Sequence, residues 1–223
     1  VMSDEEADED IETPEESILE LANIQFHPKH RLLWHYRSKH EELIAFSNHY
    51  VYDNELVIFP SAGAHDDTMG VSLVEVSGKF QRGINPAEAA AMADAIEEFM
   101  EANSHRSLGV AVMNQSQMEF IEGEMERRRG DNPKVADYYE KWEQEREGLE
   151  HFFVKNLETI QGDERDVIFI GTVYGKDADG RFYQRFGPIN WPSGKRRLNV
   201  LFSRAKEQIV TFSSIPVGEF KPN

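Results

Sequence analysis

The sequence predicts an α/β fold in which helices cover both faces of a mainly parallel β-sheet. Apolar runs rich in β-branched and aromatic residues alternate with segments of helical periodicity, the pattern typical of such folds. The run 167–173, VIFIGTV, is apolar throughout, as a strand buried on both faces requires. With 223 residues, of which 39% are hydrophobic, the chain is large enough to bury a substantial core.

The predicted elements alternate along most of the chain. Strands are expected at 31–36, 56–60, 71–76, 108–113, 151–155, 167–173 and 208–212. Helices are expected at 15–24, 38–49, 86–102, 115–129, 134–149 and 195–206. Ligands of open parallel sheets bind at the carboxyl ends of strands. That rule directs attention to the end of the first strand, the loop after 151–155 and the helix at 195–206.

Charge is unevenly distributed along a chain whose formal net charge is −17. The first 20 residues hold ten Asp or Glu and no Lys or Arg, and we expect a disordered acidic arm at 1–14 before one domain over 15–223. Residues 181–206 instead hold seven Lys or Arg and no Asp or Glu. The acidic total argues against a nucleic-acid partner, whereas the basic block favours a phosphate-bearing one.

Several classes of protein are disfavoured. No apolar run approaches the length of a membrane span, and the acidic start does not resemble a secretory signal. The absence of cysteine removes disulfides and thiolate ligands, which fits a cytoplasmic location. Five histidines between residues 27 and 49 follow no zinc signature, so we expect no metal site.

The stretch HYRS at 35–38 places polar residues where a strand is expected to end. Ser38 and Glu41 have the spacing of a capping box, so Arg37 would lie where a strand meets a helix N-terminus. Backbone N–H groups and a guanidinium at such a junction suit phosphate binding, and Tyr36 offers a ring for stacking on a base. A structural ion pair of Arg37 beside a core tyrosine explains the same residues.

A polar loop precedes the buried run at 167–173. In it, Gly162 permits a positive φ, and Glu164 carries the kind of carboxylate that binds ribose hydroxyls in other nucleotide folds. A solvated turn over residues 162–164 is the simpler explanation of this loop taken alone.

The segment 194–207, GKRRLNVLFSRAKE, combines cations with an apolar helical stripe. On a helix, Arg197 and Arg204 are seven positions apart and therefore project almost in line on one flank of that stripe. Such a flank holds a cation partly desolvated and aimed at a ligand. A solvated amphipathic helix is the alternative. The aromatic residues between 181 and 197 similarly fit either base stacking or packing of their loop onto the sheet.

Together and in this order, the three stretches resemble motifs IV, V and VI of superfamily I helicases, with the Upf-like group as the nearest match. The matching segments are HYRS at 35–38, QGDERDVIF at 161–169 and RRLNVLFSRAK at 196–206. The segment 37–48, RSKHEELIAFSN, is similar to a bacterial branch of large multidomain DNA-helicase-like proteins. The resemblance runs from residue 31 to residue 212 and implies a RecA-like three-layer sandwich, the second motor domain of such an enzyme.

The resemblance also implies roles for individual residues. Arg37 would contact the γ-phosphate of ATP, and Arg204 would be the arginine finger. The residues implied to bind the nucleotide are Tyr36 on the adenine, Glu164 on the ribose, Gln161 and Gly162 in the same loop, and Arg197. Asn156 and Thr159 would touch the backbone of a single strand of DNA or RNA.

Half of the implied machinery is absent from the sequence. It contains no G-x-x-x-x-G-K-[ST] P-loop and no acidic pair suited to Mg²⁺ after a buried strand. We therefore expect a fragment of a longer protein whose N-terminal RecA-like domain holds Mg²⁺, and we expect the isolated chain to be inactive. The alternative is a non-catalytic module that binds nucleic acid or protein and keeps a decayed nucleotide site. In such a module Arg37 and Arg204 would point apart or be sealed in internal ion pairs.

Overall fold

The computed structural model describes residues 18–31, 33–61 and 68–221. The chain divides into two compact units, one up to Leu33 and one from Trp34 onward. In the first unit, α1 (Ile18–Gln25) confirms the described part of the helix expected at 15–24. The predicted acidic arm at 1–14 lies outside the described residues.

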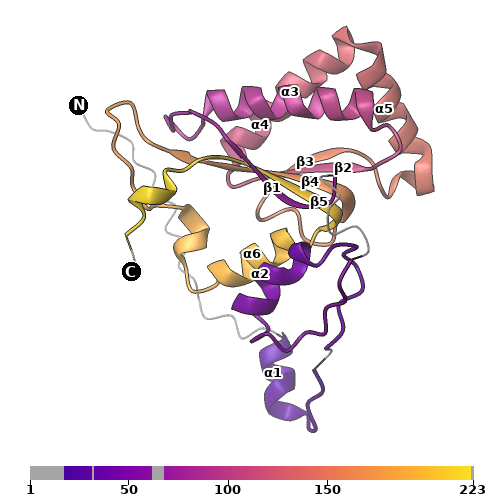
Figure 1. Cartoon of the computed structure of the whole chain (residues 1–223), viewed down its shortest axis with the longest axis vertical. Coiled ribbons are helices and arrows are strands. Elements are labelled where there is room, and N and C mark those ends of the chain that lie inside the picture. The colour runs from indigo at the N-terminus through magenta and orange to yellow at the C-terminus, as the bar shows by residue number, and fades with distance from the viewer. Residues whose placement is uncertain (1–17, 32, 62–67, 222–223) are drawn as a thin grey trace. The chain divides into compact units, whose positions relative to one another are not determined.

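The second unit is built on five strands in the order β1–β5–β4–β2–β3, and all of their pairings are parallel (Figure 1). In chain order the strands are β1 (Gly70–Glu75), β2 (Leu108–Val112), β3 (Phe153–Asn156), β4 (Arg165–Gly175) and β5 (Ala205–Ser214). Strand β4 lies at the centre, and Val167, Ile168 and Ile170 within it are fully buried, as the apolar run predicted.

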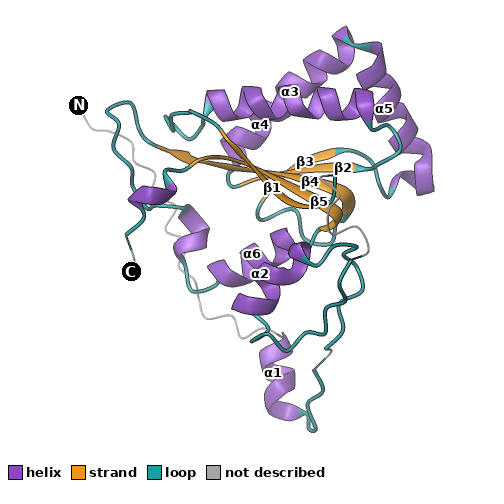
Figure 2. Ribbon diagram, viewed as in Figure 1, coloured by secondary structure: helices purple, strands orange, loops and turns teal. Residues whose placement is uncertain are grey.

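Helices cover both faces of this sheet (Figure 2). One face carries α3 (Pro86–Ala102), α4 (Gln115–Asp131) and α5 (Pro133–Gln144), and the other carries α2 (Glu42–Tyr50) and α6 (Gly194–Phe202). Three short 3-10 turns complete the described elements: η1 (Glu145–Gly148), η2 (Gly187–Asn190) and η3 (Val217–Glu219).

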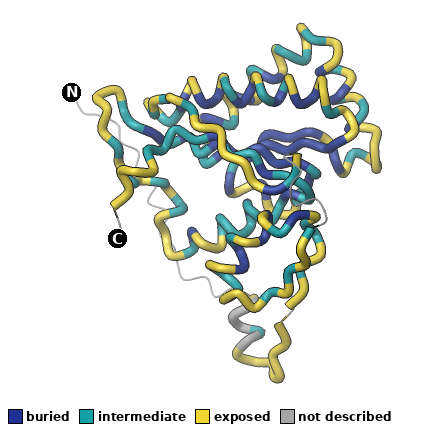
Figure 3. Tube along the Cα trace, in the orientation of Figure 1, coloured by how far each residue is buried: buried dark blue, intermediate teal, exposed yellow. Residues whose placement is uncertain are grey.

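Alternate residues of β4 supply two separate cores. Phe169 packs beneath α3, α4 and α5, whereas Ile168 and Ile170 pack with Leu43 of α2 and Leu201 of α6. Successive side chains of a strand point to opposite faces, so one apolar strand feeds both layers. Buried positions accordingly concentrate in the sheet and on the helix faces turned toward it (Figure 3). The predicted three-layer α/β architecture, with a parallel sheet and helices on both faces, is confirmed.

Two predicted strands are wrong. In the described parts of 31–36 and 56–60, strand-like pairing is limited to a single bridge between Trp34 and Val57. Both residues are exposed, Trp34 by 65% and Val57 by 40%, so neither segment has the buried neighbours that a sheet strand needs. The helix expected at 134–149 also ends early, at Gln144, because Arg146 and Glu147 have positive φ angles of 47° and 59°.

The predicted capping box before α2 does not form. The helix begins at Glu42, and Glu41 at its N-cap makes no capping hydrogen bond through its side chain. Instead, the Glu41 carboxylate accepts hydrogen bonds from the backbone N–H and the hydroxyl of Ser61. These bonds hold the pKa of Glu41 down, at about 2. Ser38 is engaged elsewhere, because its hydroxyl donates to the backbone oxygen of Ala205, 3.4 Å away.

A fully buried carboxylate lies near the carboxyl end of β4. The N-cap of α3 is Asn85, whose side chain accepts a bond from the Glu88 N–H. The Glu88 carboxylate turns inward and accepts the N–H of Val173 at 2.6 Å. Val173 has a φ of 67°, unusual for a β-branched residue, at an irregularity in the pairing of β4 with β5. Burial raises the pKa of Glu88 to about 7 despite these hydrogen bonds.

We expect Glu88 to make stability depend on pH between about 4.5 and 7. A carboxyl group whose pKa rises on folding stabilises the fold below its unfolded pKa, and that contribution is lost as pH rises through its folded pKa. A rise from 4.5 to about 7 corresponds to about 3 kcal/mol. Between pH 5 and pH 8, the free energy of unfolding of the native chain should therefore fall, relative to that of Glu88→Gln, by up to that amount. Urea denaturation of both proteins at the two pH values measures this change.

Glu98→Gln is the matched control, because Glu98 lies on the same helix but is exposed. Its difference from the native chain should not change with pH. A pH-independent difference for Glu88→Gln would contradict the raised pKa.

Candidate functional site

Residues from three distant segments meet at the amino ends of β4 and β5. The backbone N–H of Lys39 donates to the Lys206 oxygen at 2.6 Å, so the segment after Trp34 lies against the start of β5. Loop 157–164 leads from β3 into the start of β4, and α6 ends where β5 begins. The expectation that this group lies at the carboxyl ends of strands is wrong for Glu164 and Arg204, which directly precede β4 and β5, whereas the start of loop 157–164 does follow the carboxyl end of β3.

Arg204 is fixed at the junction of α6 and β5. Its Nε donates to the backbone oxygen of Val200 at 2.7 Å, and one guanidinium nitrogen donates to the backbone oxygen of Asp163 at 3.3 Å. Another guanidinium nitrogen donates to the Ser203 hydroxyl at 2.9 Å. These bonds cap a carbonyl in the last turn of the helix. Burial lowers the pKa of Arg204, and the positive charge of Arg37 lowers it further. Both guanidinium groups contact Ser203, Arg204 through the hydroxyl and Arg37 through the backbone oxygen.

Arg37 is the second cation at this edge. Its Nε donates to the Glu164 carboxylate at 2.7 Å, and a guanidinium nitrogen donates to the backbone oxygen of Ser203 at 3.2 Å. The side chains of Arg37 and Glu164 remain 30% and 43% exposed. The structure thus brings Arg37, Glu164 and Arg204 together, and the ion pair between the first two is open to solvent rather than sealed.

Further charges surround Glu164. Burial alone would raise its pKa, but the hydrogen bond from Arg37 and the charge of Lys206 hold that pKa below its usual value. The Lys206 ammonium lies 3.4 Å from Glu164 and 2.6 Å from the nearly buried Glu150. Sequence reasoning missed Lys206 as a member of this site. The signal was its place two residues after Arg204 in the same basic block.

Gly162 and Gln161 lie in the turn just before Glu164. Gly162 has a φ of 96°, and a Cβ added there would meet no atom within 4 Å. The backbone conformation therefore favours glycine, as predicted, whereas space does not require it. Gln161 is exposed.

Tyr36 lies beside a pocket of about 320 Å³ next to Arg37. Its ring is 90% exposed. His35, Trp34 and Phe59 also line the pocket. The ring centroids of Trp34 and Phe59 are 5.4 Å apart. Burial, and then the charge of Arg37, lower the pKa of His35. Aromatic walls suit a nucleotide base, and the carboxylate of Glu41 also lines this pocket.

Arg197 does not join Arg204. The predicted alignment of the two is wrong, because α6 ends at Phe202 and Arg204 lies in the turn beyond it. Arg197 lies in the first half of the helix, where it pairs with Glu158 at 3.0 Å and its guanidinium lies 5.1 Å from the centre of the Trp191 ring.

Asn156 is the last residue of β3 and Thr159 follows it, so both lie at the carboxyl end of that strand. The Asn156 side-chain oxygen accepts bonds from the N–H and the hydroxyl of Thr159, both at 3.0 Å. Its amide nitrogen donates to Gln115, the first residue of α4. The residues expected to bind nucleic acid thus form one turn, separate from the arginine pair.

The aromatic residues of the basic loop divide between the two explanations left open by the sequence. Phe182 and Phe186 pack against Phe220 near the described C-terminus, with ring centroids 5.7 and 5.9 Å apart. Tyr183 and Trp191 are 50% and 37% exposed. Packing therefore explains the first two, whereas the other two remain available for stacking.

Neither a metal-binding cluster nor a membrane-spanning helix occurs in the described ranges. No group of three or more His, Asp or Glu side chains there is placed to hold a metal ion. None of the helices in those ranges combines the length and the apolar character needed to cross a membrane.

Comparison with known proteins assigns the chain to a family. A family described as "AAA domain" matches residues 15–215. The chain belongs to that family. This AAA domain is 36% identical over 186 residues to a Mycoplasma genitalium protein named "Uncharacterized ATP-dependent helicase MG140", covering 82% of this chain. Its homologue in Mycoplasma pneumoniae is 34% identical over 190 residues and covers 85% of the chain.

The AAA domain spans 16% of the length of each of these two relatives. Among solved structures, the C-terminal domain of a possible DNA helicase from Lactobacillus plantarum is similar with a TM-score of 0.44 and 13% identity, covering 82% of this chain and 91% of that one.

We expect the ion pair between Arg37 and Glu164 to contribute little to stability. Both side chains are partly exposed, and such pairs typically contribute about 1 kcal/mol or less. A double-mutant cycle with Arg37→Ala and Glu164→Ala, measured by urea denaturation, should give a coupling energy in that range. A cycle on the exposed pair of Arg127 and Glu124 is the control and should give a similar value.

A coupling energy of about 3 kcal/mol or more would contradict this expectation, because it is typical of a pair removed from solvent. Arg37 would then be a structural residue, as the non-catalytic alternative requires.

Proposed function

We propose that this AAA domain is the second motor domain of an ATP-dependent superfamily I helicase or translocase of the Upf-like group. The observation that carries the proposal is the meeting of Arg37 and Arg204, 167 positions apart in the sequence, at one edge of the sheet with Glu164 beside them. The names of the two Mycoplasma relatives support an ATP-dependent activity for the longer protein.

On this proposal Arg204 is the arginine finger. Phosphoryl transfer develops negative charge on the γ-phosphate oxygens, and a guanidinium stabilises that charge by forked hydrogen bonds. Arg204 is suited to the task because its backbone contacts hold it in place and its partial burial limits screening of its charge. Arg37, next to it, supplies a second positive charge for the same phosphate.

The remaining proposed residues fit a nucleotide at the same edge. ATP supplies the phosphoryl group, and the N-terminal RecA-like domain of the longer protein provides the P-loop and holds Mg²⁺. In this chain Tyr36 stacks on the adenine at the rim of its pocket, and Glu164 accepts hydrogen bonds from the ribose. Gln161 and Gly162 shape the turn that presents Glu164.

The partner proposed at the carboxyl end of β3 is single-stranded DNA or RNA. Asn156 and Thr159 carry an amide, a backbone N–H and a hydroxyl in one turn, groups that commonly bind phosphate and sugar, and a bound strand would replace their bonds to each other and to Gln115. Separation of this turn from the arginine pair lets the domain hold nucleic acid and nucleotide at once. Arg197, which is apart from both places, carries no role in this proposal, and we keep the cytoplasm as the expected location.

A non-catalytic module is the second candidate, and the hydrogen bond between Arg37 and Glu164 favours it. That bond occupies both residues with each other, as a retained structural pair in a decayed site would. The convergence of Arg37 with Arg204 favours the motor domain.

We expect Arg204→Ala to abolish ATP hydrolysis by the longer protein that carries the first motor domain. An arginine finger contributes about 10³-fold or more to the rate in related hydrolases, so kcat should fall by at least that factor. ATP affinity should change little, because the finger acts mainly in the transition state. Arg204→Lys should rescue little of the rate, since an ammonium lacks the forked geometry. The measurement is steady-state ATP turnover together with binding of a fluorescent ATP analogue.

Arg127→Ala, on the outer surface of α4, is the control and should keep full activity. The isolated 223-residue chain should show no turnover. Retention of ATPase activity within about threefold by Arg204→Ala would overturn the finger assignment, and so would turnover by the isolated chain that Arg204→Ala abolishes.

A further inference from the structure

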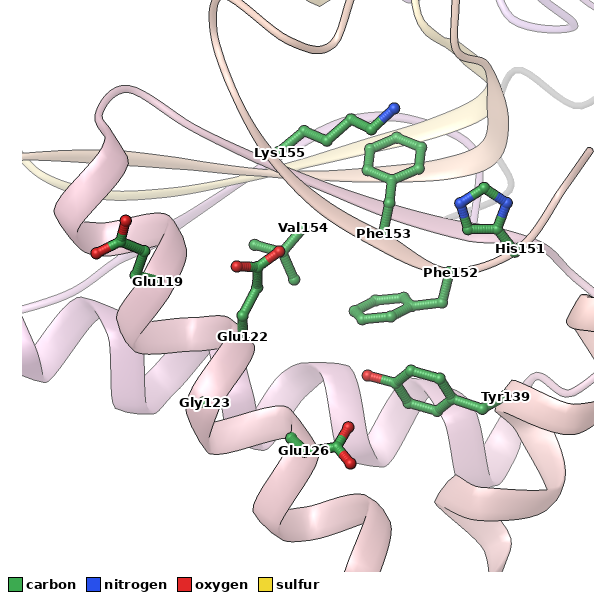
Figure 4. A pocket seen from close by; sticks show the side chains of 10 residues that line it. All are labelled: Glu119, Glu122, Gly123, Glu126, Tyr139, His151, Phe152, Phe153, Val154 and Lys155. Carbon is green, nitrogen blue, oxygen red and sulfur yellow. The ribbon is translucent and has the colours of Figure 1, made fainter.

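A second concave surface is lined by none of the residues proposed to bind the nucleotide. A groove of about 840 Å³ runs between α4 and β3, with Tyr139 of α5 at one end (Figure 4). We name it the α4–β3 groove. Its lining residues are Glu119, Glu122, Gly123, Glu126, Tyr139, His151, Phe152, Phe153, Val154 and Lys155.

One wall of the groove is a strand edge. Strand β3 is the last strand of the sheet and, among the described strands, pairs with β2 alone. On its outer side, an edge strand presents N–H and C=O groups that no neighbouring strand pairs, and these groups form a template for an added strand. An extended polypeptide can add to a sheet at such an edge.

The opposite wall carries a row of carboxylates. Glu119, Glu122 and Glu126 are spaced by three and four residues, so they share one face of α4, and all three are exposed. Neither Glu122 nor Glu126 has an ion-pair partner among the described residues. The pKa of Glu122 is raised by partial burial and then by the like charge of Glu119.

Other carboxylates of this helix layer are neutralised. On the far side of α4, Arg128 pairs with Asp94, Glu97 and Glu124. Lys155, the only ammonium that lines the groove, pairs with Asp163 at 2.6 Å. The groove thus keeps a local excess of negative charge that a cationic ligand would relieve.

The lengths of the two walls match an extended segment. The row from Glu119 to Glu126 covers about 10 Å of helix axis at about 1.5 Å per residue. A strand advances about 6.7 Å every two residues, so alternate side chains of a strand would place two cations along the row. The rings of Phe152 and Tyr139, with centroids 5.1 Å apart, form an apolar surface between the two walls.

We propose that the α4–β3 groove binds an extended basic segment of a partner protein, which adds to β3 as a sixth strand and places alternate Lys or Arg side chains against Glu119, Glu122 and Glu126. Nucleic acid does not fit, because the carboxylate row repels phosphates. The chain's own first 20 residues do not fit either, because they carry ten carboxylates and no Lys or Arg.

The test uses the 223-residue chain and three fluorescent ten-residue probes. The first alternates Lys with Thr, the second alternates Glu with Thr, and the third alternates Lys with Pro. Fluorescence anisotropy should show binding of the Lys–Thr probe, no binding of the Glu–Thr probe, and at least tenfold weaker binding of the Lys–Pro probe. Proline lacks the N–H that a sheet needs but leaves the charge unchanged.

Matched variants separate the groove from general attraction to an acidic protein. The substitutions Glu119→Lys, Glu122→Lys and Glu126→Lys together should weaken binding of the Lys–Thr probe at least tenfold. The control, Glu75→Lys with Glu98→Lys and Asp179→Lys, changes the net charge equally at exposed positions outside the groove and should weaken it less than threefold. Amide hydrogen exchange at residues 153–156 should slow when the probe binds.

Three results would overturn the proposal. Equal losses in the two triple variants would show that net charge alone attracts the probe. Equal binding of the Lys–Pro and Lys–Thr probes would exclude strand addition. Concentration-dependent dimerisation of the chain, measured by sedimentation and abolished by the groove variant but not by its control, would identify a second copy of this chain as the occupant.

Discussion

The two-residue connection between α6 and β5 is the constraint on which the candidate nucleotide edge depends. The helix ends at Phe202 and the strand begins at Ala205, so Ser203 and Arg204 must complete the turn. In this turn the backbone oxygen of Ser203 accepts a bond from Arg37, and the guanidinium of Arg204 caps a helix carbonyl. One short connection therefore orients both guanidinium groups, and its position is fixed because β5 pairs with β1 on one side and β4 on the other.

Periodicity was sufficient to predict the layers of this domain. The limits of α3 at 86 and 102 agree with the expected helix, because Pro86 marks its start and Asn85 caps it. The apolar run 167–173 identified the central strand because only a strand covered on both faces tolerates such a composition. Segments 31–36 and 56–60 misled the prediction because apolar and aromatic content favours a strand only where a neighbouring strand exists, and neighbours are a property of the tertiary fold.

The meeting of three candidate residues was predictable from the sequence, whereas the end of the sheet at which they meet was not. Arg37, Glu164 and Arg204 could be selected from their motifs, and the structure brings them together. Their end of the sheet was mispredicted because the rule that ligands bind at the carboxyl ends of parallel strands was applied to residues that directly precede a strand. Arg197 was grouped with Arg204 because a helical projection cannot indicate where the helix stops. Glu88 was missed because a glutamate three residues after an Asn N-cap normally belongs to the cap, whereas here it satisfies Val173.

Net charge is a poor guide to the partners of this domain, because its charges are sorted by surface. At the amino ends of β4 and β5, Arg37 and Lys206 pair with Glu164, Lys206 also pairs with Glu150, and the guanidinium of Arg204 contacts the neighbouring Ser203. Along β3, three carboxylates of α4 face a strand edge. A formal charge of −17 is compatible with both surfaces at once, since screening at physiological salt limits the reach of each charge to about 8 Å. An anion that approaches the first surface and a cation that approaches the second are therefore each governed by local side chains rather than by the sum over the chain.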